Sequence, residues 1–246
     1  MNIKIIENTL LSKSEKDKIE GLQRFFKTGK GEYAEDDKFL GITVPNVREV
    51  VKRFYKDINF NEIEHFISSE YHEFRLFALL VIIEKYNKTK IFDEKQKIID
   101  FYFNNLKYVN NWDLVDLSCY KLYGDFLYNF NLDRKILYDF SKSNNLWIRR
   151  ISIISTMYFV KKSDFTDALN ISKFLIKDNE DLIQKAIGWI LREIGKKDIN
   201  ILKQFLLDNI NDIQSITFSY ATEKLSQEEK IYYKNIKKNI KNKLTY

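Results

Sequence analysis

The chain has few of the residues that interrupt regular structure. Its 246 residues include one proline, Pro45, and seven glycines. An all-β protein needs such residues at its many turns, so their scarcity argues against that class. The composition instead favours helices, and a chain of this length can bury a full core.

Cysteine and histidine are also scarce, which restricts metal and redox chemistry. Cys119 is the only cysteine, so an internal disulfide and a cysteine-based metal site are excluded. The two histidines, His65 and His72, are seven residues apart and would share one helical face. Neither has another obvious ligand nearby, so we expect no metal site.

Long apolar segments are absent from the sequence. No run approaches the roughly 20 residues that cross a bilayer. The N-terminal segment contains Lys4, Glu7 and Lys13 and lacks the apolar core of a secretory signal. We therefore expect a soluble, cytoplasmic protein that makes no membrane contact.

Basic residues outnumber acidic ones, and the formal net charge is +6. A net positive field attracts polyanions and raises encounter rates, so an anionic partner is plausible. Lysine, asparagine and isoleucine are abundant throughout the chain, so part of this charge reflects the background composition.

All three tryptophans stand in similar phrases. Aligning these phrases places Asp116, Arg150 and Lys185 at corresponding positions, 34 and 35 residues apart, and Arg75 fits one further period upstream. A repeating protein thus presents charge at one position of each unit. The phrases are Asn111-Trp112-Asp113-Leu114-Val115-Asp116, Leu146-Trp147-Ile148-Arg149-Arg150 and Gln184-Lys185-Ala186-Ile187-Gly188-Trp189.

Apolar residues recur at intervals of three and four, which is the pattern of amphipathic helices. Helix pairs that repeat every 35 to 40 residues or so are typical of an α-solenoid of the HEAT or armadillo kind. We predict an all-α fold, an α-solenoid of HEAT-like repeats with a curved concave face, as one domain over residues 1–246. An irregular helical bundle is the alternative. The inner helices are predicted near 72–86, 112–127, 146–160, 181–195 and 212–225.

Two segments break the repeat. Residues 1–45 should form N-terminal helices and a glycine-bearing loop at 27–41, where Gly29-Lys30-Gly31 lacks the spacing and the preceding strand of a phosphate loop. Residues 226–246 should form a basic C-terminal helix, more often a solvated cap than a nucleic-acid contact. Its lysines are Lys230, Lys234, Lys237, Lys238, Lys241 and Lys243.

The repeated tryptophan phrases would place indoles and charges on one surface. Trp112 and Asp116 are four residues apart, so they lie on the same face of a helix, and Lys185 and Trp189 repeat that spacing. Alone, such a tryptophan is more often a core residue, and such an aspartate more often belongs to an ordinary salt bridge. Their conjunction across three repeats favours a functional surface.

These phrases, together with residues 38–45 and 183–193, resemble the AlkD-like family of DNA alkylation repair glycosylases over about residues 20–225. The resemblance implies HEAT-like repeats and a DNA glycosylase of base-excision repair that needs no cofactor. Its substrate would be double-stranded DNA containing cationic alkylated purines, such as 3-methyladenine and 7-methylguanine. We expect a monofunctional, monomeric enzyme.

The resemblance also implies roles for individual residues. Asp116 would be the catalytic carboxylate, flanked by Trp112 and Trp189. Arg150 would hold a phosphate, and Arg149 and Lys185 would add sequence-independent attraction to DNA. Phe25 matches a DNA-approaching tyrosine of the family but lacks its hydroxyl group.

Two other functions remain open at this stage. The first is a DNA-binding module of the same fold that recognises bent, branched or damaged DNA without cleaving the glycosidic bond. The change at Phe25 and the altered loop at 27–41 favour it, and the presence of Asp116 argues against it. The second is a protein-interaction solenoid. That alternative leaves the basic surface and the ordered indole and carboxylate groups unexplained.

Overall fold

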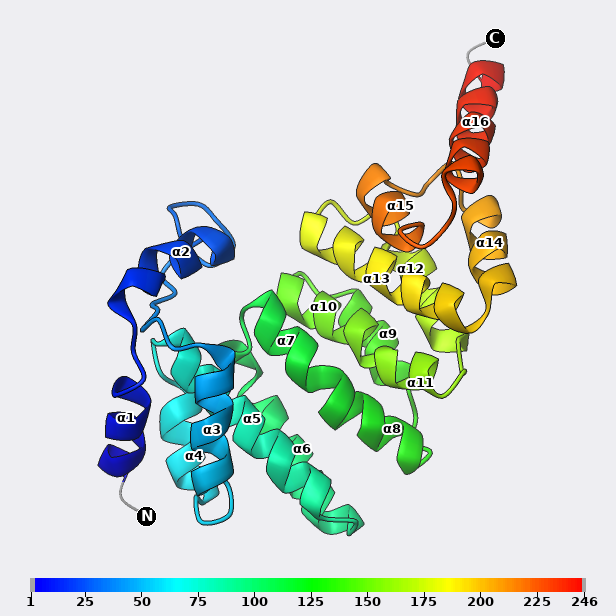
Figure 1. Cartoon of the computed structure of the whole chain (residues 1–246). Helices are drawn as coiled ribbons and strands as arrows, with labels where there is room; N and C mark the ends of the chain where they lie inside the picture. Colours follow the sequence, from blue (N-terminus) through cyan, green and yellow to red (C-terminus); the bar gives the residue numbers. More distant parts are fainter. Residues whose placement is uncertain (1–2, 245–246) are drawn as a thin grey trace. The chain divides into compact units, whose positions relative to one another are not determined.

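The structure, a computed structural model, describes residues 3–244 and the side chains of residues 3–239. Within this part of the chain every regular element is helical, apart from one isolated bridge between Lys38 and Tyr71 (Figure 1). The prediction of an all-α fold is confirmed. The chain divides into two compact units, residues 1–118 and 119–246. The single domain and its concave face stay predictions.

The first unit contains seven α-helices and a short 3₁₀ turn among its described residues. The helix α7 begins in this unit and extends one residue beyond it. The elements are α1 (Ile3–Leu11), α2 (Lys16–Phe26), α3 (Val44–Phe54), α4 (Phe60–Ile67), α5 (His72–Lys88), α6 (Phe92–Asn104), η1 (Leu106–Tyr108) and α7 (Trp112–Cys119).

The second unit continues directly from α7 through a π-helical segment. Its elements are η2 (Tyr120–Gly124), α8 (Asp125–Asn129), α9 (Lys135–Ser141), α10 (Leu146–Ser155), α11 (Met157–Lys161), α12 (Thr166–Leu175), α13 (Asp181–Lys197), α14 (Ile199–Asp208), α15 (Ser215–Ala221) and α16 (Gln227–Leu244).

Short links join neighbouring helices into pairs. Helix α4 packs on α5, α9 on α10, and α12 on α13, and the linking segments are residues 68–71, 142–145 and 176–180 (Figure 1). Links of this length hold two helices side by side, each burying its apolar face on the other. Helix α5 is the most enclosed, with most of its residues buried. This is the pairing that HEAT-like repeats require.

Polar side chains mark the starts of several helices. Asn59 and Glu62 form a capping box at α4, where Asn59 Oδ1 accepts a hydrogen bond from the Glu62 amide at 3.0 Å and Glu62 accepts one from the Asn59 amide at 2.9 Å. Asn145 accepts hydrogen bonds from the amides of Trp147 and Ile148 at α10. Each cap satisfies amides that have no partner inside the helix.

The predicted inner helices correspond to α5, to α7 with η2 and α8, to α10 with α11, to α13 and to α15. Two of them are not uniform α-helices: a π segment interrupts one at Tyr120–Gly124, and a turn at Thr156 separates α10 from α11. A Cβ atom at Gly124 would lie 2.3 Å from the Ser155 carbonyl oxygen, so glycine permits this close approach to α10. Periodicity alone cannot predict such an interruption.

The histidine prediction needs a correction. His65 lies in α4 and His72 begins α5, so they do not share one helical face. Helix α4 ends at Ile67, and residues 68–71 link it to α5. His65 Nε2 instead contacts Glu7 at 2.7 Å.

The glycine-bearing loop folds back on the end of α2. The amides of Gly29 and Gly31 donate to the carboxylates of Glu32 and Glu35, both at 2.8 Å. These amides are the groups with which a phosphate loop would bind its ligand. The loop's own carboxylates occupy them here.

Among the described residues, no helix is both long enough and apolar enough to cross a bilayer. Helix α16 is the longest element, and its sequence is strongly polar. It covers most of the predicted C-terminal segment. The side chains of Lys241 and Lys243 lie outside the described residues.

Candidate functional site

The start of α7 places Trp112 and Asp116 one turn apart. The buried side chain of Asn111 precedes the helix, and its Oδ1 accepts a hydrogen bond from the Trp112 amide at 2.8 Å. Trp112 and Asp116 are both half-buried. The positive end of the helix dipole favours carboxylates in these first turns, which include Asp113 as well as Asp116.

Aromatic rings from α2 hold the indole of Trp112. Phe26 is buried and stacks on Trp112 with ring centroids 5.4 Å apart and an interplanar angle of 22°. Phe25 meets the same indole edge-to-face at 5.7 Å, and its side chain is 63% exposed. Phe39 and His72 also pack on the ring of Phe26, with centroids at 5.1 and 4.9 Å. These contacts fix the ring of Phe26, which in turn supports the indole of Trp112.

A buried histidine links this aromatic cluster to α7. His72 Nε2 lies 2.9 Å from Asp113 Oδ2, and Nδ1 lies 3.2 Å from Asp37 Oδ2. Burial lowers the pKa of His72, but the charge and hydrogen bond of Asp113, with the hydrogen bond to Asp37, outweigh it and raise that pKa to about 9. The ring is therefore an imidazolium at neutral pH and donates to both carboxylates.

Asp37 is the centre of a second set of contacts. It also accepts a hydrogen bond from Asn111 Nδ2 at 3.1 Å and pairs with the guanidinium of Arg75. Burial raises the pKa of Asp37, but the hydrogen bond from His72 and the charge of Arg75 outweigh it, and the pKa lies below its usual value. Asp37 and His72 thus tie the glycine-bearing loop and α5 to the cap of α7.

The loop that follows is held by one carboxylate. Glu73 is buried and accepts hydrogen bonds from the amides of Leu40, Gly41 and Ile42 at 2.9 to 3.1 Å. Gly41 has a φ of +77°, and a Cβ atom there would lie 2.1 Å from the Glu15 carbonyl oxygen. Only glycine fits this turn without strain. The residues at 38–45 therefore have a structural role, because they hold the N-terminal segment against α5.

The structure supports the predicted register of the three charged positions. Asp116, Arg150 and Lys185 are each the fifth residue of their helices, which begin at residues 112, 146 and 181. Arg75 does not share that position, because it is the fourth residue of α5. Leu76 occupies the equivalent position in that helix.

Hydrogen bonds show where Arg75 belongs. Its Nη1 donates to the carbonyls of the residues six and five positions earlier, at 3.0 and 3.2 Å. Arg149 repeats this with the carbonyls of residues 143 and 144, at 2.9 and 3.1 Å. Gln184, also a fourth helix residue, donates to the carbonyl of Asp178 six positions earlier at 2.7 Å. The side chain of the fourth helix residue is therefore hydrogen-bonded to the backbone of the segment that joins the two helices of its pair.

Arg149 is thus used within the protein. Besides those carbonyls, its Nε lies 2.6 Å from Asp178 Oδ2. The next residue, Arg150, is buried, and its Nη1 donates to the Leu182 carbonyl oxygen at the start of α13. Both arginines therefore connect the start of α10 to the following helix pair.

The phrase in α13 combines packing residues and half-buried ones. Gln184 is fully buried and bonds to Thr217 of α15. A Cβ atom at Gly188 would lie 2.4 Å from Tyr220 Cβ, so this glycine allows α13 and α15 to pack closely. Lys185 and Trp189 are half-buried. Gln184 and Gly188 are therefore used in packing, whereas the packing contacts described here do not involve Lys185 and Trp189.

The structure brings together some of the predicted site residues. Phe25, Trp112 and Asp116 lie in the first unit, where Phe25 contacts Trp112. The other four lie in the second unit and come from α10 and α13; they are Arg149, Arg150, Lys185 and Trp189.

Sequence reasoning missed the residues that support Trp112. Phe26, Asp37, His72 and Asp113 carry that support. The adjacency of Asp113 to Trp112 was the available signal for one of them. Nothing in the spacing of His72, 41 residues earlier, indicated its pairing with Asp113.

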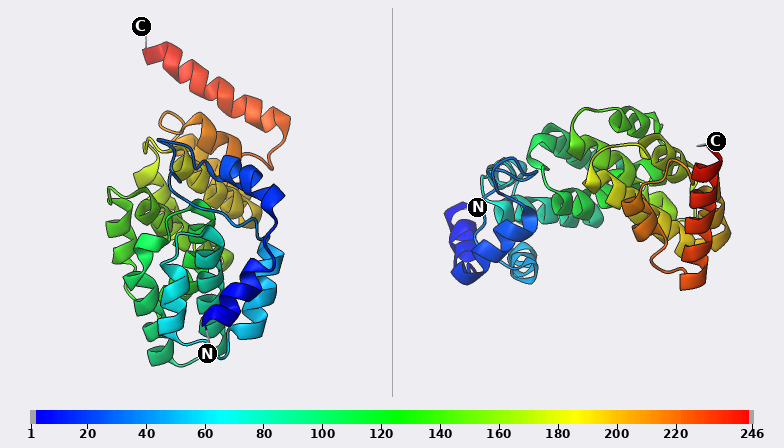
Figure 2. Two further views of the ribbon diagram at one scale, coloured as in Figure 1. Left: turned by 90° about the vertical axis from the view of Figure 1, so that its left-hand side faces the viewer. Right: turned by 90° about the horizontal axis from the view of Figure 1, so that it is seen from above.

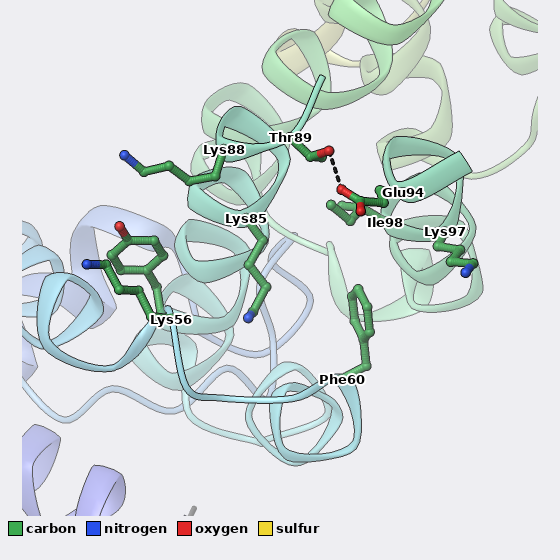
Figure 3. Close-up of a pocket in the computed structure, with 9 residues that line it drawn as sticks. Lys56, Phe60, Lys85, Lys88, Thr89, Glu94, Lys97 and Ile98 are labelled. Atoms are coloured by element: carbon green, nitrogen blue, oxygen red, sulfur yellow. Dashed lines mark hydrogen bonds between the residues drawn. The ribbon is translucent and has the colours of Figure 1, made fainter. Parts of the chain in front are cut away.

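A separate cavity of about 650 Å³ lies at the other end of α5 (Figure 3). Figure 3 shows Lys85 pointing into it, with Phe60 and Lys88 around it. Burial lowers the pKa of Lys85, while the nearby carboxylates of Asp57 and Glu62 act in the opposite direction. Four lysines and one glutamate, Glu94, line the cavity, and Glu94 accepts a hydrogen bond from Thr89; we assign no ligand to it.

The comparisons with known proteins agree with this architecture. A family model described as DNA alkylation repair enzyme matches residues 6–225. The chain belongs to this DNA alkylation repair enzyme family. No curated protein sequence matches it.

Solved structures show the fold of the DNA alkylation repair family in related form. A predicted DNA alkylation repair enzyme from Enterococcus faecalis has a TM-score of 0.70 at 17% identity, covering 87% of this chain and 98% of its own. AlkD2 from Streptococcus mutans has a TM-score of 0.54 at 17% identity, covering 86% and 99%. At these identities the likeness concerns the fold. Membership of a DNA alkylation repair family implies DNA as the partner.

Proposed function

We propose that this member of the DNA alkylation repair family is a monofunctional DNA glycosylase. It hydrolyses the N-glycosidic bond of cationic alkylated purines in duplex DNA, such as 3-methyladenine and 7-methylguanine, as a cytoplasmic monomer without metal or cofactor. The observation that carries the proposal is the pair formed by Trp112 and Asp116 on the first turns of α7, with Trp112 stacked on Phe26.

The chemistry needs few groups. Alkylation at N3 of adenine or N7 of guanine makes the base a cation, and a cationic base leaves without a general acid. The enzyme must then stabilise an oxocarbenium-like sugar and position a water molecule. A carboxylate stabilises the positive charge electrostatically and accepts a hydrogen bond from the water.

In this proposal the carboxylate is that of Asp116, and its neighbour Asp113 has a structural role. Asp113 is bonded to His72 and to the amide of Leu114, so its oxygens are used in holding the helix start. Asp116 lies one turn after Trp112, whose π-face attracts partly positive groups of the sugar. In this proposal Trp189 flanks the sugar as a second indole.

Basic residues of α10 and α13 supply the attraction to DNA. In this proposal Arg150, whose Nη1 already donates to the Leu182 carbonyl oxygen, binds a phosphate next to the lesion with the remaining donors of its planar guanidinium. Lys185 adds charge at the equivalent position of the next helix pair, and Arg149 adds charge while it holds the preceding link. Phe25, exposed beside Trp112, contacts the sugar-phosphate backbone through its ring.

The reaction stops at base removal. Strand cleavage by a lyase needs an amine nucleophile with a lowered pKa, and Lys185 is the one amine of the three phrases. In this proposal Lys185 attracts DNA through its charge and does not act as a nucleophile. We therefore expect an abasic site and an intact strand as products.

The test is incubation of the purified protein with methylated duplex DNA, followed by chromatography of released bases. Free 3-methyladenine or 7-methylguanine, formed equally with and without a chelator, supports the proposal. If release requires added metal, the cofactor-free mechanism is wrong.

A non-catalytic DNA-recognition protein of the same fold is the second candidate. Phe25 favours it, because the hydroxyl expected at this position from the family resemblance is missing. For this candidate, DNA binding persists in the same assay while neither base is released.

A further inference from the structure

Helix α16 lies beyond the part of the chain that the family model matches, which ends at residue 225. It is nevertheless anchored to the second unit. Ser226 and Glu229 form a capping box at its start, with amide contacts of 2.9 and 3.2 Å. Glu229 also pairs with Lys203 of α14 at 2.6 Å, and Tyr233 is buried near Phe218 of α15.

A cavity of about 600 Å³ lies between α15 and α16. Four lysines of α16 line one side of it, namely Lys230, Lys234, Lys237 and Lys238. Serine and threonine hydroxyls and the ring of Phe218 line the other. None of the described residues that line this cavity is acidic. Figure 2 shows α16 following α15 along this part of the chain.

The lysine arrangement is unfavourable for an isolated helix. Lys230, Lys234 and Lys238 follow one another at four-residue intervals, so their ammonium groups are neighbours on one face. Like charges at this spacing repel. Among the described residues, neither Lys234 nor Lys238 has an acidic partner, whereas Lys203 and Lys196 of the same unit pair with glutamates. Lys230 and Lys237 donate to the carbonyl oxygens of Glu223 and Ile213 and so help to hold α16, but a solvated cap does not need Lys234 and Lys238 on the same side.

We propose that this lysine cleft, defined by the four lysines named above and by Phe218, binds the sugar-phosphate backbone of duplex DNA. It is a second contact surface, separate from the residues assigned to base release, and it rests on the proposed function only in that DNA is the partner. The lysines span about 12 Å along α16, from the rise of roughly 1.5 Å per residue. Duplex DNA carries about one charge per 1.7 Å of its axis, so several phosphates fall within that length. The hydroxyl groups of Ser215 and Ser219 opposite are donors for the same oxygens.

The test compares the double variant Lys234→Gln/Lys238→Gln with a control that loses the same charge elsewhere in the unit, Lys173→Gln/Lys196→Gln. Affinity for an unmodified duplex is measured across a salt series. Each lost phosphate contact lowers the slope of log affinity against log salt by about 0.9, so the cleft variant should lower it by about 1.8. The control should keep the native slope. Both variants must keep the native melting temperature.

An unchanged slope in the cleft variant, or an equal change in the control, overturns the proposal. Flotation with vesicles of anionic phospholipid provides a further arm, because a membrane surface carries the same kind of charge. Loss of vesicle binding with unchanged DNA binding would also overturn it. A native protein that releases alkylated bases while the cleft variant keeps its slope refutes this proposal alone. A lowered slope without any base release refutes the glycosylase alone.

Discussion

The imidazole of His72 lies 2.9 Å from the carboxylate of Asp113, and this contact joins the first turn of α5 to the first turn of α7. Asp113 is adjacent to Trp112 in sequence, and the ring of His72 packs on Phe26, which stacks on Trp112. Trp112 is thus held in two ways: through the adjacent residue Asp113 in its backbone, and through the stacking of its ring on Phe26. A charged histidine buried between carboxylates is therefore part of what positions the candidate site.

The stability of the protein should depend on the charge of His72. Its pKa is raised from 6.5 to about 9 in the folded protein. The stabilisation is fully present below pH 6.5 and is lost as the pH rises through about 9, and it amounts to about 3 kcal/mol. Urea unfolding at pH 6.5 and 9.5 measures it.

The matched variants are His72→Gln and His65→Gln. The first should be less stable at pH 6.5 and should lose most of the pH dependence in this range. The second should retain it, because His65 is at the surface beside Glu7 rather than between buried carboxylates. Equal pH dependence in native protein and His72→Gln would contradict this account.

Gly188 should tolerate no side chain. In Gly188→Ala the new Cβ would lie 2.4 Å from Tyr220 Cβ and 2.9 Å from the Thr217 carbonyl oxygen. Forcing α13 and α15 apart should cost about 1–3 kcal/mol of unfolding free energy. Gly21→Ala is the control, since a Cβ there would meet nothing within 4 Å outside the adjacent residues and backbone of its own helix; it should stabilise α2 by about 0.5–1 kcal/mol. A Gly188→Ala protein as stable as the native one would refute the close packing.

Substitutions of the two adjacent arginines of α10 should have different effects on the salt dependence of DNA binding. Arg149→Ala removes a partly buried ion pair with Asp178 and two bonds to the link before α10, so it should lower stability by about 2 kcal/mol. It should leave most of the salt dependence of DNA binding. Arg150→Ala should flatten that dependence by about one phosphate contact, and it should also lower stability, because the buried guanidinium donates to the Leu182 carbonyl oxygen. The melting temperature and a salt titration of DNA binding are measured for each variant. If Arg149→Ala flattens the salt dependence and Arg150→Ala does not, the phosphate contact belongs to Arg149.

Much of the fold was predictable because the signals are local. Apolar spacing and the lack of proline predict the helices, and the tryptophan phrases give a register that places Asp116, Arg150 and Lys185 at one helix position. Arg75 was misplaced by one residue. Its true equivalence to Arg149 rests on hydrogen bonds to link carbonyls, and a side chain's hydrogen-bond acceptor cannot be read from spacing.

The support of the candidate site was not predictable for a different reason. His72 and Asp113 are far apart in sequence and meet only through the packing of α5 near α7. Phe26 looked like one more aromatic residue of an aromatic-rich helix end, yet it contacts Trp112 and His72. Gln184 and Gly188 show the converse, since residues within a recognisable phrase are used in packing.

The most direct test is single-turnover base release from methylated duplex DNA by the native protein, Asp116→Asn and Asp100→Asn. Asp100 is an exposed aspartate of α6 and serves as the control. Loss of the catalytic carboxylate should slow release by roughly 10²–10⁴-fold, while DNA affinity stays near the native value and Asp100→Asn releases bases at the native rate. Native rates from Asp116→Asn, or a loss of affinity that accounts for the whole defect, would contradict the assignment of Asp116 as the catalytic group.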